Sequence, residues 1–299
     1  MLSAEQQKDT PFCLHARHAM TPIGQRLREV DSAAELIIVL NDAMVCHNAI
    51  NESCGILHRD ISANNILVVR EKDKPVRGML IDFDCAIVES DKSASIRPER
   101  TGTLPFMSIA NLERMDIQRT VLDDWESLLY LVCWLATFGI NRKNDREDED
   151  EHLPIKSWSS DSPSITAREK RNHLDSVRSF RVNILKHFQK KQDLWGALYH
   201  LARRLHESLF FNGNLDEKVR MRCHGATDDL LEEPDDDLIM EESDGSGDNR
   251  DTHSENGLNK DSSEEVNPFV ERITHAKSLT KDLLEVLSKS AALAYKRMK

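Results

Sequence analysis

The sequence predicts a mainly α-helical fold with one small β-hairpin, followed by a disordered acidic segment and a C-terminal helix. Apolar residues recur at helical spacing over most of the chain. Residues 66–69 and 78–81 are short apolar runs joined by a polar turn with Pro75, which predicts a hairpin. Residues 225–267 are poor in apolar side chains and rich in Asp, Glu, Ser and Gly, a composition typical of disorder.

The first long helix is predicted between residues 32 and 54. Ser32 and Glu35 have the spacing of a capping box, in which each side chain accepts from a free backbone N–H group of the first turn. Gly55 is well suited to end the helix in a left-handed conformation. Before this helix, residues 18–24 suggest a short strand that enters a turn.

A second helix is predicted over residues 123–138, with Asp123 as its N-cap. It is apolar nearly all round, which indicates a buried central helix. Helices are also expected at about 167–191 and 193–211. The predicted domains are an N-terminal segment (1–15), a globular domain (16–224) with a polar insertion (141–166), an acidic linker (225–267) and an amphipathic C-terminal helix (268–299).

Charge and cysteine content restrict the classes of function. The net charge is −12, and residues 228–265 hold 16 acidic and 2 basic residues, or −14, so the remainder carries +2. A general nucleic-acid-binding surface is therefore not expected. The six cysteines form no Cys-x-x-Cys pair, which favours free thiols in a reducing compartment. The longest apolar run, 128–140, is too short to span a bilayer, so we expect an intracellular protein, cytoplasmic or nuclear, without a membrane segment.

One motif carries chemistry. His58, Arg59 and Asp60 are followed by Asn65 five residues after Asp60, which is the pattern of a protein-kinase catalytic loop. Such a loop needs a carboxylate beside the attacking hydroxyl and an amide oxygen for a phosphate-bound Mg²⁺. The predicted hairpin then leads to Asp82, a second candidate metal ligand. The order predicts Asp60 as the catalytic residue, Asn65 and Asp82 as metal ligands, and ATP and Mg²⁺ as cofactors.

These motifs resemble the larger, mainly helical lobe (C-lobe) of eukaryotic protein kinases, and most closely the fungal-type protein kinase domain family. The resemblance covers residues 16–212 and includes the stretches 100–107 and 123–128. Residues 108–110, Ser-Ile-Ala, are similar to the casein kinase variant of the usual Ala-Pro-Glu. The resemblance implies ATP- and Mg²⁺-dependent phosphoryl transfer to Ser or Thr of a protein substrate.

The resemblance also implies roles for further residues. They are structural support of the loop by His58, Arg59, Phe83 and Asp124, adenine contacts by Leu67, Thr21 and Ile23, and substrate binding by Gly102 and Thr103. A phosphate on the activation loop could pair with Arg59. Its candidate acceptors are Ser90, Ser93, Ser95 and Thr101, although an unmodified polar loop residue is the simpler interpretation of each.

The sequence departs from the kinase pattern at several positions. Asp84 replaces the Gly of Asp-Phe-Gly, Ser62 replaces a Lys that would contact the γ-phosphate, and Ala110 replaces a Glu that would form a structural ion pair. No Gly-rich loop and no Val-Ala-x-Lys strand precede Asp60. We therefore expect a kinase-like C-lobe that lacks most of the N-lobe.

Three alternatives follow from these departures. The chain could be a catalytically impaired, pseudokinase-like C-lobe that binds partner proteins through its exposed cleft face and its C-terminal helix. It could be a truncated gene model of a full kinase. Aminoglycoside-type phosphotransferases also place an Asp and an Asn five residues apart, but Gly102, Thr103 and Asp124 favour the protein-kinase branch.

Overall fold

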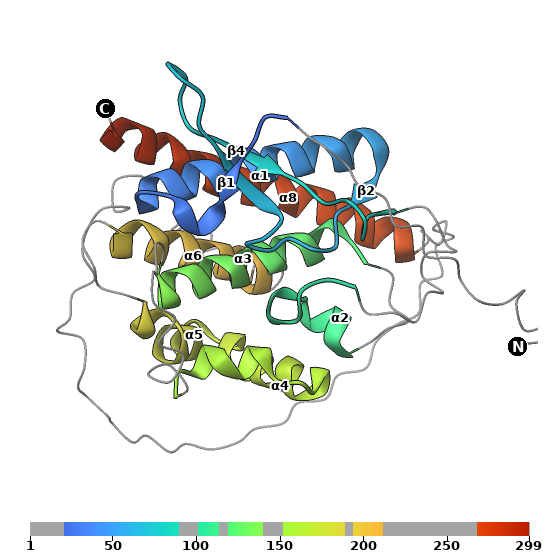
Figure 1. Cartoon of the computed structure of the whole chain (residues 1–299). Coiled ribbons are helices and arrows are strands. Elements are labelled where there is room, and N and C mark those ends of the chain that lie inside the picture. Colours follow the sequence, from blue (N-terminus) through green and yellow to red (C-terminus); the bar gives the residue numbers. More distant parts are fainter. Residues whose placement is uncertain are drawn as a thin grey trace, which may run out of the picture.

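The computed structural model describes residues 21–89, 101–113, 119–139, 152–188, 194–211 and 268–298. These residues form a mainly helical molecule with two small sheets (Figure 1), which confirms the predicted mixture of helices with little β structure. The helices are α1 (Ala33–Cys54), α2 (Ile109–Glu113), α3 (Val121–Phe138), α4 (Pro163–Leu174), α5 (Val177–Asn183), α6 (Leu194–Phe211) and α8 (Pro268–Met298). The strands are β1 (Gln25–Arg26), β2 (Ile56–Leu57), β3 (Ile66–Val69), β4 (Arg77–Leu80) and β5 (Ile87–Val88).

Helix α1 begins and ends where the sequence predicts. The Ser32 hydroxyl accepts a hydrogen bond from the Glu35 N–H at 3.1 Å, and Gly55 ends the helix at φ 64°. The predicted capping box is only half formed, because the Glu35 carboxylate accepts from the N–H of Asp31 at 2.5 Å. The buried Glu35 side chain also pairs with Arg70 at 2.7 Å, which draws it away from Ser32.

Strands β3 and β4 form the predicted antiparallel hairpin, with Ile66 opposite Leu80. Strand β1 pairs with the other edge of β3, so pairing starts at Gln25 and the described part of the predicted 18–24 strand is not a strand. The hairpin lies directly on α1, because a Cβ atom at Gly78 would come within 2.0 Å of the Val39 carbonyl oxygen. The Gly78 N–H donates to the Asp42 carboxylate at 3.0 Å.

Helix α3 is the buried central helix that its composition predicts. Its N-cap is Thr120, three residues earlier than expected. Asp123 lies inside the first turn, and its carboxylate reaches back to accept from the Thr120 N–H at 2.7 Å. The acidic residue therefore caps the helix from within the first turn.

The structure corrects the prediction for residues 141–191. The described part of the predicted polar insertion forms a 3-10 helix, η5 (Pro154–Ser159), and the first turn of α4. Trp158 of η5 is fully buried. The predicted helix 167–191 is divided, because Ser176 caps a new helix, α5, by accepting from the Ser179 N–H at 3.0 Å. The remainder of the predicted insertion, 141–151, lies outside the described residues.

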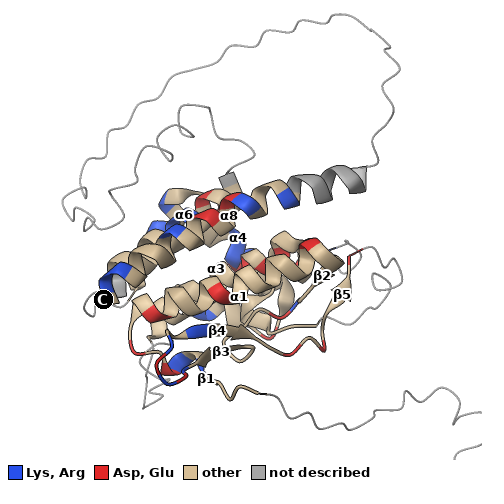
Figure 2. Cartoon of the chain, turned by 90° about the horizontal axis from the view of Figure 1, so that it is seen from above, with Lys and Arg blue, Asp and Glu red and all other residues tan. Residues whose placement is uncertain are grey.

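The C-terminal helix α8 is part of the core. Figure 2 shows α1 between the strands on one side and α8 on the other, and α8 also contacts α6 and α3. Its apolar stripe is buried at Ala276, Leu279, Leu283 and Leu287. The apolar face of this helix is therefore packed inside the fold, and partner binding by α8 stays a prediction. The predicted acidic linker, 225–267, lies outside the described residues.

Helix α1 is long and apolar enough to cross a membrane by length and composition alone, and 61% of its most apolar window is buried. One such helix is weak evidence, since a core helix passes the same test. Here β4 and α8 cover α1 from two sides, which accounts for its apolar composition.

Candidate active site

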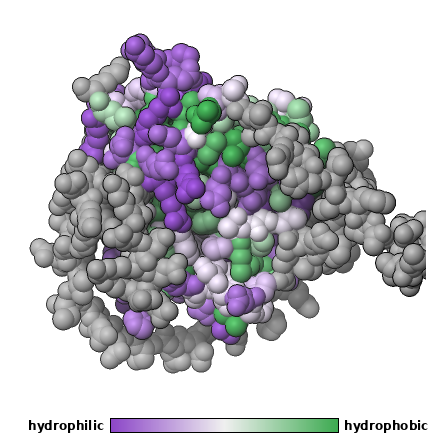
Figure 3. All heavy atoms as spheres, viewed as in Figure 1, coloured by the Kyte–Doolittle hydropathy of each residue, from purple (hydrophilic) through white to green (hydrophobic). Residues whose placement is uncertain are grey.

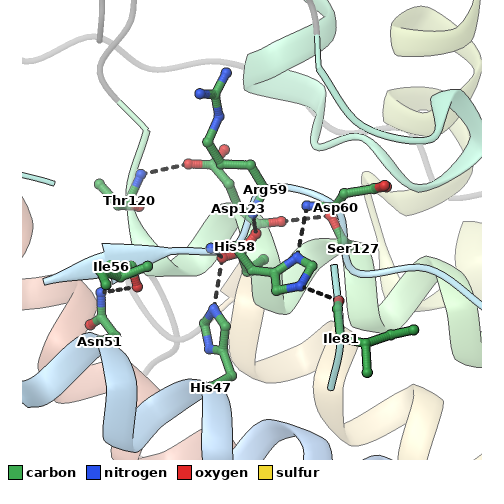
Figure 4. A network of polar contacts seen from close by, with 11 residues as sticks. His47, Asn51, Ile56, His58, Arg59, Asp60, Ile81, Thr120, Asp123 and Ser127 are labelled. Carbon is green, nitrogen blue, oxygen red and sulfur yellow. Dashed lines mark hydrogen bonds and ion pairs between the residues drawn. The ribbon is translucent and has the colours of Figure 1, made fainter. Parts of the chain in front are cut away.

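Asp124 of α3 holds the backbone of the loop that contains Asp60. The Asp124 carboxylate accepts the backbone N–H of His58 and the backbone N–H of Arg59, both at 2.9 Å. These two bonds fix the Leu57–His58 and His58–Arg59 peptide planes, which lead to Asp60 (Figure 4). The structure therefore places Asp124 where the sequence expectation puts it, under the loop backbone.

A third group contacts the Asp124 carboxylate, and the sequence did not predict this contact. His47 of α1 contacts the Asp124 carboxylate through Nε2 at 2.7 Å, and both side chains are buried. Burial alone would raise the pKa of Asp124, but the hydrogen bond and the charge of His47, together with the hydrogen bond from the His58 backbone N–H, outweigh it and lower that pKa. His47 lies seventy-seven residues before Asp124, so no local pattern links the two; its polar ring within an apolar helix was the one available signal.

His58 connects the loop to the strand that leads to Asp82. Its Nε2 lies 3.0 Å from the Ile81 carbonyl oxygen, and its Nδ1 accepts from the Asp60 N–H at 3.3 Å. This pattern requires the neutral ring with its proton on Nε2. The ring of Phe83 meets that of His58 edge to face, with centroids 4.7 Å apart. The expected contact between His58 and Phe83 is therefore present.

The Asp60 carboxylate is held on both oxygens. Oδ1 accepts from the N–H and from the hydroxyl of Thr103, each at 2.8 Å. Oδ2 accepts from the Asn65 amide at 2.8 Å, and the same amide nitrogen donates to the Asp60 carbonyl at 2.9 Å. Three of the predicted site residues thus meet at one carboxylate, although Thr103 is forty-three residues from Asp60.

Gly102 is required by this close approach. Its φ is 113°, a value that side chains rarely adopt, and a Cβ atom there would lie 2.7 Å from the Arg59 carbonyl oxygen. Only glycine lets the 102–103 backbone come this near to the catalytic loop. The Gly102–Thr103 segment, which the resemblance assigns to substrate binding, therefore lies directly against the backbone of this loop.

Two residues of the site have left-handed backbone conformations. Arg59 has φ 71° and Asp82 has φ 64°. Non-glycine residues of this kind cost free energy and concentrate at functional sites. Asp84 is not among the positive-φ residues, so the aspartate that replaces glycine there adds no such strain.

The residues present fit a nucleotide-bound Mg²⁺ in their chemistry. Asn65 uses its amide nitrogen for Asp60, which leaves its amide oxygen as a ligand. Asp82 is exposed, and within the described residues its carboxylate accepts a long hydrogen bond, 3.4 Å, from the Asp84 N–H. The described residues hold no cluster of three or more His, Cys, Asp or Glu suited to a metal, so two protein ligands would share the ion with phosphate oxygens.

Of the expected adenine contacts, Leu67 lies in the three-stranded sheet, and Thr21 and Ile23 lie in the segment just before strand β1. Leu67 of β3 is opposite Arg26, and a Cβ at Gly24 would come within 2.5 Å of the Leu67 side chain. Thr21 and Ile23 directly precede this contact, and Ile23 is 88% exposed. The segment that contains Thr21 and Ile23 and the side chain of Leu67 are therefore neighbours.

The departures from the kinase pattern have structural counterparts. Ser62, in place of Lys, is buried, and its hydroxyl has no hydrogen-bond partner within the described part of the chain.

Two groups near the loop have shifted pKa values. Burial and the charge of Arg59 lower the pKa of Arg119 to about 10. Burial and the charge of Asp60 raise the pKa of the Cys85 thiol.

Cysteines and candidate phosphoacceptors are only partly described. Cys46, Cys54, Cys85 and Cys133 are free thiols, in agreement with the prediction for these four. Thr101 is partly buried beside Gly102, and Ser90, Ser93 and Ser95 lie outside the described residues.

The comparison with protein families agrees with this geometry. Residues 2–136 match the family model described as fungal protein kinase. The resemblance to that family is thereby confirmed over this range, and a kinase-type transferase is the class that it indicates. The matched range ends within α3, so it is shorter than the predicted 16–212, and α4, α5, α6 and α8 lie beyond it. A search of curated proteins found no match.

Proposed function

We propose that the described residues form the C-lobe of a protein kinase domain that transfers phosphate from ATP to a Ser or Thr hydroxyl of a protein. The observation that carries the proposal is the arrangement at Asp60. One carboxylate is oriented by Asn65 and Thr103, on a loop whose backbone is held by Asp124. This arrangement is suited to a residue that orients an attacking hydroxyl and accepts its proton.

The chain's own residues would divide the work. Asp60 orients the hydroxyl and accepts its proton. Thr103 donates to Oδ1 of Asp60 and so places the substrate segment next to this carboxylate. Asn65 and Asp82 would hold Mg²⁺, which supplies charge neutralisation at the phosphates when bound. Leu67 and the segment from Thr21 to Ile23 would contact the adenine. Phosphate-binding elements of the usual kind are not encoded in residues 1–59, so the proposal concerns the substrate side of the reaction.

A phosphate-transfer assay tests the proposal. The purified chain is incubated with radiolabelled ATP, Mg²⁺ and a mixture of Ser/Thr-containing proteins. Asp60→Asn keeps the size of the side chain and removes the proton acceptor, so we expect a loss of about 10²-fold or more. Asp84→Asn changes a nearby exposed carboxylate and serves as the matched control. Transfer by the unaltered chain that equals that of Asp60→Asn would refute the proposal.

A second candidate function is a non-catalytic binding unit. Ile23 is 88% exposed and Phe83 38% exposed. In Figure 3 apolar side chains gather over the sheet, next to the hydrophilic tip of the β3–β4 hairpin. Exposed apolar patches of this kind favour association with another protein.

Association through this surface can be measured by sedimentation. Ile23→Asp should shift any self-associated species of the purified chain toward monomer, because it replaces a highly exposed apolar side chain with a charge. The exposed Lys72 offers a control, Lys72→Asp, on the hairpin turn. A chain that sediments as a stable monomer at all concentrations would argue against self-association through this surface.

A further inference from the structure

Three consecutive residues that follow the Gly102–Thr103 segment are each fixed by a side chain from the helical core. The Met107 carbonyl accepts from Lys170 Nζ of α4 at 2.6 Å. The Ser108 hydroxyl donates to the Asp123 carboxylate of α3 at 2.5 Å. The Ile109 N–H donates to the Glu126 carboxylate of α3 at 2.7 Å.

Lys170 is the unusual member of this set. It is fully buried, and its ammonium group lies 3.8 Å from the centre of the Tyr130 ring and 5.7 Å from that of Trp158. Within the described residues its ammonium group donates a hydrogen bond to the Met107 carbonyl. A lysine is rarely buried to this degree unless its charge is compensated.

Burial lowers the pKa of Lys170, and the charge of Glu126 and the two aromatic faces oppose this effect in part. Glu126 accepts from the Tyr130 hydroxyl, and Tyr130 is the ring beneath the ammonium group. The Glu126 and Lys170 side chains therefore hold the 107–109 backbone between them, each by one hydrogen bond. A buried hydrogen bond is costly to leave unmade, so these two bonds resist local opening of this segment.

The 107–109 segment is connected to the site by a short turn. The 3-10 turn η3 (Leu104–Phe106) joins it to Thr103 through a bond from the Phe106 N–H to the Thr103 carbonyl at 2.9 Å. Thr103 in turn donates twice to Asp60. Met107 also lies near the other end of the turn, since a Cβ at Gly102 would come within 3.8 Å of its Cε.

We propose that Lys170 is a positioning residue, which, through the Met107 carbonyl and with Glu126 at Ile109, holds the Gly102–Thr103 substrate segment against Asp60. The residue next in the chain, Ala110, stands where kinases carry the Glu of a structural ion pair. The buried Lys170 and Glu126 supply an anchor for the same segment from α4 and α3. The role of this anchor in phosphate transfer rests on the proposed function; its role in ordering the segment does not.

Hydrogen exchange tests the ordering of the segment directly. Lys170→Met replaces the ammonium with an apolar group of similar length. We expect the Thr103 and Ile109 amides to exchange about tenfold faster or more, because a hydrogen bond from a charged donor is lost. Amides of α1 and β4 should not change. The double variant Lys170→Met/Glu126→Gln removes both charges and should show the same local effect at Thr103, while the exposed Lys186→Met is the matched control.

Global stability separates positioning from general destabilisation. Removing one member of a buried charge pair destabilises, whereas replacing both members often leaves stability unchanged or raises it, so the urea midpoint of the double variant Lys170→Met/Glu126→Gln should not fall. Should Lys170→Met fail to fold, Lys170→Gln keeps a donor and removes the charge, and its local exchange is measured in the same way. Unchanged exchange at Thr103 and Ile109 in a folded Lys170 variant overturns the proposal, as does faster exchange throughout the chain.

The kinetic effect is measured where phosphate transfer by the unaltered chain is established. Lys170→Met should lower kcat about tenfold or more and leave the KM for ATP within twofold, because the anchor lies on the substrate side. An increased KM for ATP with unchanged kcat would contradict the positioning role. An unaltered chain without transfer refutes the proposed function alone, and the exchange result then decides whether Lys170 orders the segment.

Discussion

At the residue scale, Asp124 connects the site to the core. Its carboxylate accepts two backbone N–H groups of the catalytic loop and contacts the buried His47 ring. A buried carboxylate is costly unless its oxygens are satisfied. His47 therefore stabilises the group that fixes the loop, and the position of Asp60 depends on a residue of α1 that lies outside the kinase motifs of the sequence.

Substitution of His47 measures this dependence. We expect His47→Leu to lower the free energy of unfolding by about 1.5–3 kcal/mol, since a hydrogen bond to a buried charged group is lost. Urea denaturation at pH 7 gives the value. A double-mutant cycle with Asp124→Asn isolates the pair, and the exposed His152→Leu is the control. A coupling energy near zero would mean that His47 does not act through Asp124.

At the element scale, the hairpin and α1 meet backbone to backbone at Gly78, and α3 and α4 meet around the 107–109 segment. Neither contact follows from helix or strand propensity. The Gly78 contact leaves no room for a Cβ, and the second contact encloses two charged side chains, Lys170 and Glu126. Each contact makes a prediction at this scale.

Gly78→Ala should destabilise the fold. The added methyl would lie 2.0 Å from the Val39 carbonyl oxygen, and displacing the hairpin from α1 should cost about 1–3 kcal/mol or more. Gly196→Ala is the matched control, because nothing lies within 4 Å of its Cβ position. In helix α6 this change should stabilise by about 0.5–1 kcal/mol. Thermal or urea unfolding of both variants gives the comparison; similar effects for the two would contradict the proposed contact.

Glu126 should make stability depend on pH. Burial, which outweighs the bonds from Tyr130 and Ile109, raises its pKa from 4.5 to about 7. A group with a raised pKa in the folded state binds more protons when folded, so its contribution to stability is present below pH 4.5 and is lost as the pH rises to about 7. Glu126→Gln should remove this loss of stability. Urea unfolding at several pH values from 4.5 to 7.5 tests this, with the exposed Glu113→Gln as control. Parallel profiles for the unaltered chain and Glu126→Gln would contradict it.

At the scale of the whole molecule, α8 is part of the same core as the site. It packs on α1, α6 and α3, and Ser288 donates to Asn41 of α1 at 2.9 Å. Helix α1 contains His47, which contacts Asp124, so α8 packs against the helix that reaches the site. The folded unit therefore extends well beyond the residues 2–136 that match the kinase family.

Leu283 tests whether α8 is part of the cooperative core. Its side chain is fully buried, and Leu283→Ala should cost about 2–5 kcal/mol because it removes buried methyl groups and leaves a cavity. The exposed Lys281→Ala in the same helix should change stability by less than about 0.5 kcal/mol. Tryptophan fluorescence in urea follows the change. A separate transition for α8, with the main midpoint unchanged, would show that the helix is not part of the cooperative unit.

The sequence by itself determined the features that depend on neighbouring residues. The order of His58, Asp60 and Asn65 predicts a catalytic loop because one short turn must present a carboxylate and an amide together. Ser32 and Gly55 predict the ends of α1 because caps are local. Two local features were predicted incorrectly. Asp123 caps its helix from inside the first turn, and Ser176 begins a new helix where apolar spacing alone predicts a continuous one.

The tertiary structure alone decided which distant residues complete the site. His47 reaches Asp124 across 77 positions, Lys170 reaches Met107 across 63, and Ser288 reaches Asn41 across 247. The physical reason is that a buried polar group must find a partner wherever packing brings one near, and packing depends on the whole core. The sequence thus predicted the chemistry at Asp60, whereas only the folded chain showed what holds that carboxylate in place.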